Sequence, residues 1–240
     1  MILEARNLMV SFGGVVAVND VSIFFEKQKI VALIGPNGAG KTTVFNLLSG
    51  FLKGKGEVLF ENQNLSRLPP HEICRLGMAR TFQIVQPFGA QSVRENIAVG
   101  AHLRHRNRAD ALKAAEAVAA RVGLAGELGK PADSLTIAGR KRLELARALA
   151  TEPKLLLLDE VLAGLNPREI ADMIPVVREL RASGITVLMV EHVMQAVMNL
   201  ADEAWVLSNG RVIAHGTPAE VTAHPAVIEA YLGRMKAAHA

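Results

Sequence analysis

Cysteine, aromatic residues and long apolar runs are all scarce in this chain of 240 residues. Cys74 is the single cysteine, which excludes an intrachain disulfide and fits a reducing compartment. Aromatic residues make up only 4% of the sequence, which argues against a module that binds nucleic acids by stacking bases. The densest apolar runs, at 31–34, 155–158 and 187–190, are far shorter than the roughly 18 residues that cross a bilayer. They are expected to be buried strands, and any membrane crossing must be made by a partner.

Neither positive nor negative charge is in large excess. Lysine and arginine number 27 against 23 acidic residues, so the formal net charge is +4. This mild excess fits a protein near an anionic membrane surface, but it is not the basic stripe of a DNA-binding protein, and we expect no nucleic-acid partner. Half of the residues are apolar, which is an ordinary composition for a domain with a sizeable core.

The order of the expected elements predicts an α/β fold. Short strand patterns at 2–8, 15–18 and 21–25 favour an antiparallel β layer at the start of the chain. Later apolar runs are typical of buried core strands, at 29–34, 155–158, 186–190 and 204–207. Helical patterns dominate the stretch between them, at 92–103, 110–122 and 141–150. We therefore predict one core formed by 1–87 and 151–240, with an inserted helical subdomain at 88–150.

The most specific motif follows the expected strand at 29–34. Eight residues match the pattern G-x-x-x-x-G-K-[ST] without departure: Gly35, Pro36, Asn37, Gly38, Ala39, Gly40, Lys41 and Thr42. The glycines let backbone N–H groups curl around phosphates, the next helix presents its N-terminus, and Lys41 can reach the β- and γ-phosphates. The Thr42 hydroxyl is a candidate Mg²⁺ ligand, and Thr43 is expected to contact the nucleotide beside it. The motif predicts a P-loop NTPase core of the RecA-like type that binds ATP and Mg²⁺.

Two acidic residues follow the apolar run at 155–158. Asp159 is the candidate that holds Mg²⁺, as a P-loop enzyme requires. Glu160 comes one residue later, where its carboxylate could polarise an attacking water as a general base. The same pattern is also typical of a buried strand capped by solvated acids, and only its pairing with the P-loop favours catalysis.

Gln83 and His192 are weaker candidates on spacing alone. His192 comes after the expected strand at 186–190, at the sheet edge where α/β proteins bind ligands. A lone histidine in such a place is nevertheless more often structural than catalytic. Gln83 shows no chemistry in its spacing, and a surface glutamine is the ordinary interpretation.

The P-loop, Asp159-Glu160, Gln83 and His192 occur in an order that resembles the ATPases of ABC transporters, and the likeness covers the whole chain. The resemblance implies that Gln83 senses Mg²⁺ and the γ-phosphate and connects to the permease. It also implies that His192 contacts the γ-phosphate and that Phe12 stacks on adenine, although Phe12 also fits a core position of the β layer.

The segment that should carry the family's signature departs from the usual Leu-Ser-Gly-Gly-Gln. Counted back from Ala146-Arg147-Ala148-Leu149, it contains Leu135, Thr136, Ile137, Ala138 and Gly139. In the family this segment meets the γ-phosphate of ATP held by the other subunit, so Thr136, Ala138 and Gly139 are the expected contacts. The Cβ atoms of Ile137 and Ala138 limit how closely the backbone approaches a phosphate. We therefore expect a weakened site and a different ATPase chain as partner, with a tolerated variant in two identical chains as the alternative.

Several segments resemble the ATPases of branched-chain amino acid importers, at 80–83, 163–167, 191–192 and 229–233. The resemblance implies uptake of branched-chain or hydrophobic amino acids, or related small solutes. It implies transmembrane permease subunits, a second ATPase subunit and, indirectly, a periplasmic solute-binding protein as partners. The chain would then lie peripherally on the cytoplasmic face of the inner membrane. Alternatives are a lipopolysaccharide-export ATPase, a slow-hydrolysing regulatory subunit, and a soluble ABC ATPase acting on DNA or ribosomes, which the lack of coiled-coil arms disfavours.

Overall fold

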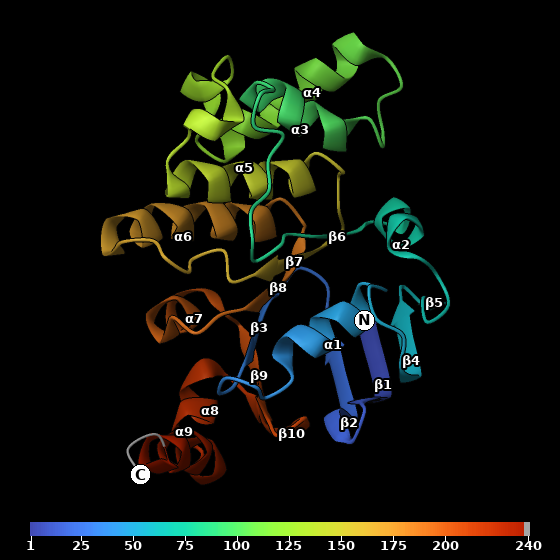
Figure 1. The fold of residues 1–240 in the computed structure, drawn as a ribbon, viewed down its shortest axis with the longest axis vertical. Helices are drawn as coiled ribbons and strands as arrows, with labels where there is room; N and C mark the ends of the chain where they lie inside the picture. Colours follow the sequence, from blue (N-terminus) through green and yellow to red (C-terminus); the bar gives the residue numbers. More distant parts are fainter. Residues whose placement is uncertain (238–240) are drawn as a thin grey trace.

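The computed structural model describes residues 1–237 as two β-sheets with helices packed around them (Figure 1). The strands are β1 (Leu3–Phe12), β2 (Val15–Phe25), β3 (Ile30–Ile34), β4 (Lys55–Phe60), β5 (Gln63–Asn64), β6 (Met78–Arg80), β7 (Leu155–Asp159), β8 (Thr186–Val190), β9 (Glu203–Ser208) and β10 (Arg211–Gly216). The α-helices are α1 (Lys41–Leu48), α2 (Pro70–Leu76), α3 (Val93–Ala101), α4 (Arg108–Arg121), α5 (Ile137–Leu149), α6 (Pro167–Ala182), α7 (Met194–Leu200), α8 (Pro218–Ala223) and α9 (Pro225–Ala237).

The larger sheet is the mainly parallel core, with the strand order β10-β9-β3-β8-β7-β6. Only the pairing of β9 with β10 is antiparallel. Every residue of β3, β7 and β8 is buried, as expected for parallel strands that are covered on both faces. Because parallel strands end at the same edge, the loops that follow β3, β8 and β7 lie side by side. This edge carries the P-loop, His192 and the pair Asp159-Glu160.

The two faces of this sheet are covered by different apolar clusters. On one face, α1 packs between the core and the antiparallel sheet β2-β1-β4-β5, which buries Val44, Phe45 and Leu48 completely. On the other face, α5, α6 and α7 contribute to a second cluster that also includes α3 and α4. Burying α1 on all its apolar positions fixes the start of this helix, and hence the P-loop, relative to the strand ends.

Helices α3, α4 and α5 form a layer of their own, at the top of Figure 1. A capping box starts α3, because Ser92 accepts from the backbone N–H of Glu95 and the Glu95 carboxylate accepts from that of Ser92. Helix α4 buries a stripe of alanines, Ala111, Ala115 and Ala119, whose small side chains allow close packing against its neighbours. The boundaries of a helical subdomain at 88–150 remain a prediction.

Several local expectations were incomplete. The segments 15–18 and 21–25 belong to one strand, β2, because Asp20 takes a left-handed φ of 59° and the ladder with β1 continues past an irregularity. Helix α5 begins at Ile137, not near residue 141, because the Thr136 hydroxyl caps it. Elements without a clear apolar period were missed: α2, β5, β6, α7 and β10.

Candidate nucleotide-binding site

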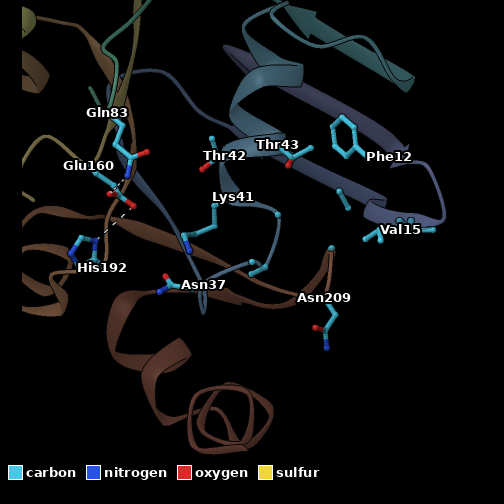
Figure 2. A pocket seen from close by; sticks show the side chains of 16 residues that line it. Phe12, Val15, Asn37, Lys41, Thr42, Thr43, Gln83, Glu160, His192 and Asn209 are labelled. Carbon is cyan, nitrogen blue, oxygen red and sulfur yellow. Dashed lines mark hydrogen bonds and ion pairs between the residues drawn. The ribbon is translucent and has the colours of Figure 1, made fainter. Parts of the chain in front are cut away.

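The P-loop opens into a cleft of about 980 Å³ (Figure 2). The cleft is lined by residues of the P-loop, of β2 and of the strand ends: Phe12, Val15, Val16, Ala17, Asn37, Gly38, Ala39, Gly40, Lys41, Thr42, Thr43, Gln83, Glu160, His192, Asn209 and Gly210. Most of the residues that the sequence singled out are therefore brought to one cavity. Gly35 and Pro36 lie at the start of the same loop, next to the cavity lining.

Lys41 begins α1 directly after the loop and is mostly buried. Its Nζ donates to the carbonyl oxygens of Gly35 at 2.7 Å and of Pro36 at 3.2 Å, so the ammonium group lies inside the curl of the loop. Gly40 has a φ of 103°, and a Cβ atom at this position would lie 2.7 Å from the carbonyl oxygen of Ala17. Only glycine fits both the conformation and the space. Gly40, Lys41, Thr42 and Thr43 all line the cleft, so the N-terminal end of α1, with its positive dipole end, faces it.

Glu160 stands opposite the P-loop between two polar partners (Figure 2). Gln83 Nε2 donates to Glu160 Oε2 at 2.8 Å, and His192 Nδ1 lies 3.8 Å from Glu160 Oε1. The backbone of Glu160 has a left-handed φ of 49°, and its N–H donates to the carbonyl oxygen of Val190 at 3.0 Å. A non-glycine residue rarely holds this conformation, so the turn after β7 aims the carboxylate in a fixed direction.

Asp159 is at the end of β7 and is almost fully buried. It lines a second cavity of about 520 Å³ next to the cleft, and Thr42 lines both. Asp159 and Thr42 therefore approach the same region from the strand end and from the first turn of α1. Arg80, which the sequence analysis did not single out, donates from Nη2 to Asp159 Oδ2 at 2.7 Å.

Phe12 and the signature segment lie at the surface. The Phe12 side chain is 52% exposed and lines the cleft beside Val15 and Val16, so it is not a core residue of the β layer. Thr136 and Gly139 form the cap of α5, in which the Thr136 hydroxyl accepts from the Gly139 N–H at 3.1 Å. The segment with Thr136, Ala138 and Gly139 is outside the residues that line the cleft of its own chain.

Two buried charged residues behind Glu160 escaped the sequence analysis. Lys141 projects from α5 and donates from Nζ to the carbonyl oxygens of Glu160 at 3.0 Å and of Gln83 at 3.5 Å. Glu191, directly after β8, accepts from the backbone N–H of Leu162 at 3.0 Å. Burial raises the pKa of Glu191 to about 7. The sequence offered two signals that could have identified these residues. Lys141 lies on the apolar side of α5, and Glu191 comes directly before His192.

Comparison with known proteins places this geometry in a family. A model described as ABC transporter matches residues 18–163, which include the P-loop, Gln83 and Glu160. The chain belongs to the ABC transporter family. A second model, described as branched-chain amino acid ATP-binding cassette transporter, matches residues 211–237. As a member of this family the chain is the ATP-hydrolysing component, and its family binds nucleotide.

Individual relatives match over nearly their whole length. The chain is 41% identical to the high-affinity branched-chain amino acid transport ATP-binding protein LivG of Escherichia coli K12, over 97% of this chain and 98% of that protein. It is 39% identical to the corresponding BraF protein of Pseudomonas aeruginosa, with the same coverage. A crystal structure of a nucleotide-free ATP-binding cassette superimposes with a TM-score of 0.88 at 33% identity, over 96% of this chain and 98% of the other. The fold expected from the sequence is thereby confirmed.

Within residues 1–237, no helix has both the length and the apolar character needed to span a bilayer. Members of this family act together with transmembrane components.

Proposed function

We propose that this chain hydrolyses ATP to drive the uptake of branched-chain amino acids, or of closely related hydrophobic solutes, through a separate permease. Two observations together carry the proposal. The P-loop and Glu160 line the same cleft, and nearly the full chain is similar to proteins named as branched-chain amino acid transport ATP-binding proteins. The match of residues 211–237 to a model of the same transporter type supports the same solute class.

The cleft fits ATP from one end to the other. The P-loop backbone and the Lys41 ammonium group would hold the phosphates, because both line the cleft and N–H donors and positive charge both attract phosphate. The exposed ring of Phe12, next to Val15 and Val16, would stack on the adenine. Thr43 lines the same cavity and would contact the phosphates from the first turn of α1.

The residues around Thr42 and Asp159 fit Mg²⁺ by the chemistry of their donor atoms. A hydroxyl oxygen from Thr42, a carboxylate oxygen from Asp159 and the amide oxygen of Gln83 are hard ligands, and all three residues line one cavity. Mg²⁺ is commonly bound through one or two such groups together with substrate phosphates, so a larger protein cage is not needed. When bound there, the ion would neutralise charge on the phosphates.

Glu160 would act as the general base. A water attacking the γ-phosphorus forms a new P–O bond while the bond to the β-phosphate oxygen breaks, and the Glu160 carboxylate takes the proton of that water. Gln83 and His192 flank both carboxylate oxygens, at 2.8 and 3.8 Å, and would fix the direction of the base. His192 would also donate to the γ-phosphate from the far side of the cleft.

The catalytic unit is proposed to be a pair of ATPase chains. The signature segment of the same chain is outside the residues that line the cleft. Thr136, Ala138 and Gly139 would therefore meet the γ-phosphate held by a partner chain. Ile137 is 66% exposed at this helix start, and its branched side chain would stand between α5 and that phosphate. A sister ATPase with an intact signature would confine the weakness to one of two sites.

The permease is proposed to dock on the segment 84–91 that follows Gln83. Ile84 is 74% exposed and Phe88 is 46% exposed, so two large apolar side chains stand at the surface of this segment. Gln83 contacts Glu160 directly before the segment, and Asn96 of α3 holds Phe88 within it, through bonds to its N–H and carbonyl groups. A helix seated here would touch an element tied to both the nucleotide site and the helical layer. The chain would then lie on the cytoplasmic face of the inner membrane, and a periplasmic solute-binding protein would act through the permease.

The test is uptake of radiolabelled leucine into membrane vesicles that contain the complete transporter. Vesicles with the wild-type chain should accumulate leucine only with internal ATP, and vesicles with Lys41→Ala should not. Unlabelled isoleucine and valine should compete, whereas a polar amino acid such as aspartate serves as the control. ATP-dependent export of a lipid, or leucine uptake that is unaffected by Lys41→Ala, would contradict the proposal.

A further inference from the structure

Arg80 occupies an unusual place for a cation, because its side chain is only 8% exposed and lies against the end of β7. It is the last residue of β6 and stands three positions before Gln83. Its partner Asp159 is the last residue of β7, and that side chain is 3% exposed. A pair this well buried is held by its surroundings and is screened little by solvent.

The guanidinium group connects three elements of the nucleotide site. Nη2 donates to Asp159 Oδ2 at 2.7 Å, and Nη1 donates to Asn46 Oδ1 at 2.6 Å and to Ser49 Oγ at 3.1 Å. Asn46 is in α1, the helix that starts at Lys41, and Ser49 caps its end. The planar fork of an arginine suits such a bridge, because its donors point in fixed directions.

Three aromatic rings enclose the same group. The Arg80 Cζ atom lies 5.6 Å from the ring centres of Phe45 and Phe51 and 5.4 Å from that of Phe82. Phe51 and Phe82 also contact each other edge to face, with their centres 5.5 Å apart. These cation–π contacts leave the guanidinium little freedom to turn.

We propose that Arg80 is a positioning residue that orients the carboxylate of Asp159 for Mg²⁺. With Oδ2 held by a rigid donor and the Asp159 N–H donated to the Thr81 hydroxyl at 3.0 Å, the side chain presents Oδ1 in one direction. Partners of this kind, which orient a metal ligand without touching the metal, commonly change metal affinity 10- to 100-fold. The inference rests on the proposed function only in taking Asp159 as a ligand of Mg²⁺.

The experiment compares nucleotide affinity with and without the metal. A fluorescent, non-hydrolysable ATP analogue is titrated into the purified chain, once in Mg²⁺ and once in EDTA. The readout is the ratio of the affinity in Mg²⁺ to the affinity in EDTA. Arg80→Lys keeps the charge but cannot bridge Asp159 and Asn46 in one plane. We expect it to lower the ratio about tenfold while the affinity in EDTA stays at the wild-type value.

Two further variants sharpen the result. Asn46→Ala leaves the pair of Arg80 and Asp159 intact but removes the 2.6 Å anchor, and it should lower the ratio in the same direction by a smaller factor. Arg147→Lys is the matched control, because Arg147 also lies on this cavity but stacks on Phe88 and pairs with Glu144, and within the described residues it makes no ion pair with Asp159. Its ratio should be that of the wild type.

Asp159→Asn separates this inference from the function on which it rests. If Asp159→Asn leaves the ratio unchanged, Asp159 is not a ligand, and the magnesium assignment fails. If Asp159→Asn abolishes the effect of Mg²⁺ but Arg80→Lys retains the wild-type ratio, only the role of Arg80 is refuted. Equal losses in Mg²⁺ and in EDTA for Arg80→Lys would show a merely structural role and would also overturn the inference.

Discussion

Glu191 should make the stability of this protein depend on pH in a defined direction. Its side chain is 1% exposed, and its Oε2 has no hydrogen-bond partner within the described residues. Burial raises the pKa of Glu191 from 4.5 to about 7, and the nearby charge of Glu160 acts in the same direction. The hydrogen bond from Leu162 and the charge of Lys141 oppose the rise without cancelling it.

The sign follows from which state holds the proton. Between pH 4.5 and about 7, the folded protein keeps a proton on Glu191 that the unfolded chain has released. The free energy of unfolding therefore falls as the pH rises through this window, and above about pH 7 the loss is complete. A pKa raised from 4.5 to about 7 corresponds to about 3 kcal/mol, since one pKa unit is worth ~1.4 kcal/mol.

Glu191→Gln isolates this effect. Glutamine has nearly the same shape, keeps a carbonyl oxygen for the N–H of Leu162 and cannot ionise. The wild type loses stability as the pH rises, and the variant does not. The difference in free energy of unfolding, variant minus wild type, should therefore grow by about 3 kcal/mol from pH 4 to pH 8. Any fixed cost of burying the amide N–H₂ group lowers the free energy of unfolding by the same amount at every pH. The change between pH 4 and pH 8 is therefore unaffected.

The assay is urea unfolding followed by circular dichroism at several pH values from 4 to 8. The control is Glu116→Gln, which makes the same chemical change at a side chain that is 46% exposed and paired with Arg94, where we expect little change with pH. A Glu191→Gln advantage that is the same at every pH, or one that shrinks as the pH rises, would refute the reasoning.

Three further variants test other parts of the site. Lys41→Ala should weaken ATP binding about 10- to 100-fold in a fluorescence titration, since the phosphates lose a charged donor, and an unchanged affinity would contradict the P-loop assignment. Glycines restored at Ile137 and Ala138 should raise the ATPase rate of the assembled transporter, whereas no change in a complex with two copies of this chain would end the proposal of unequal sites. Cysteine at Phe88 should cross-link to the permease, and success only at Val99, which is 48% exposed on α3, would move the docking surface.

The sequence was sufficient to predict which segments meet at the cleft, because local motifs encode them. The P-loop needs a strand, glycines and a helix start in fixed order, and all of these are contiguous between Ile30 and Leu48. The pair Asp159-Glu160 is equally local, directly after the four leucines of β7. Because parallel strands end at one edge, the meeting of these segments with His192 could be expected before any coordinates.

The partners that hold the site in place were not predictable in the same way. Arg80 reaches Asp159 across 79 positions, and Lys141 reaches the carbonyl oxygen of Glu160 across 19. Contacts between residues so far apart in the sequence depend on how strands and helices pack, and no rule of sequence spacing predicts them. The same limit explains why the bond between Gln83 and Glu160, which spans 77 positions, was not predicted.

The central claim, that Glu160 is the base of an ATP-hydrolysing site, is tested most directly by Glu160→Gln. Phosphate release should be measured in the assembled transporter, with ATP binding measured in parallel. The amide keeps the size of the side chain but cannot take a proton from water, so we expect ATP binding to remain and turnover to fall by about 10²-fold or more. Turnover within a few-fold of the wild type, at unchanged ATP binding, would contradict the account.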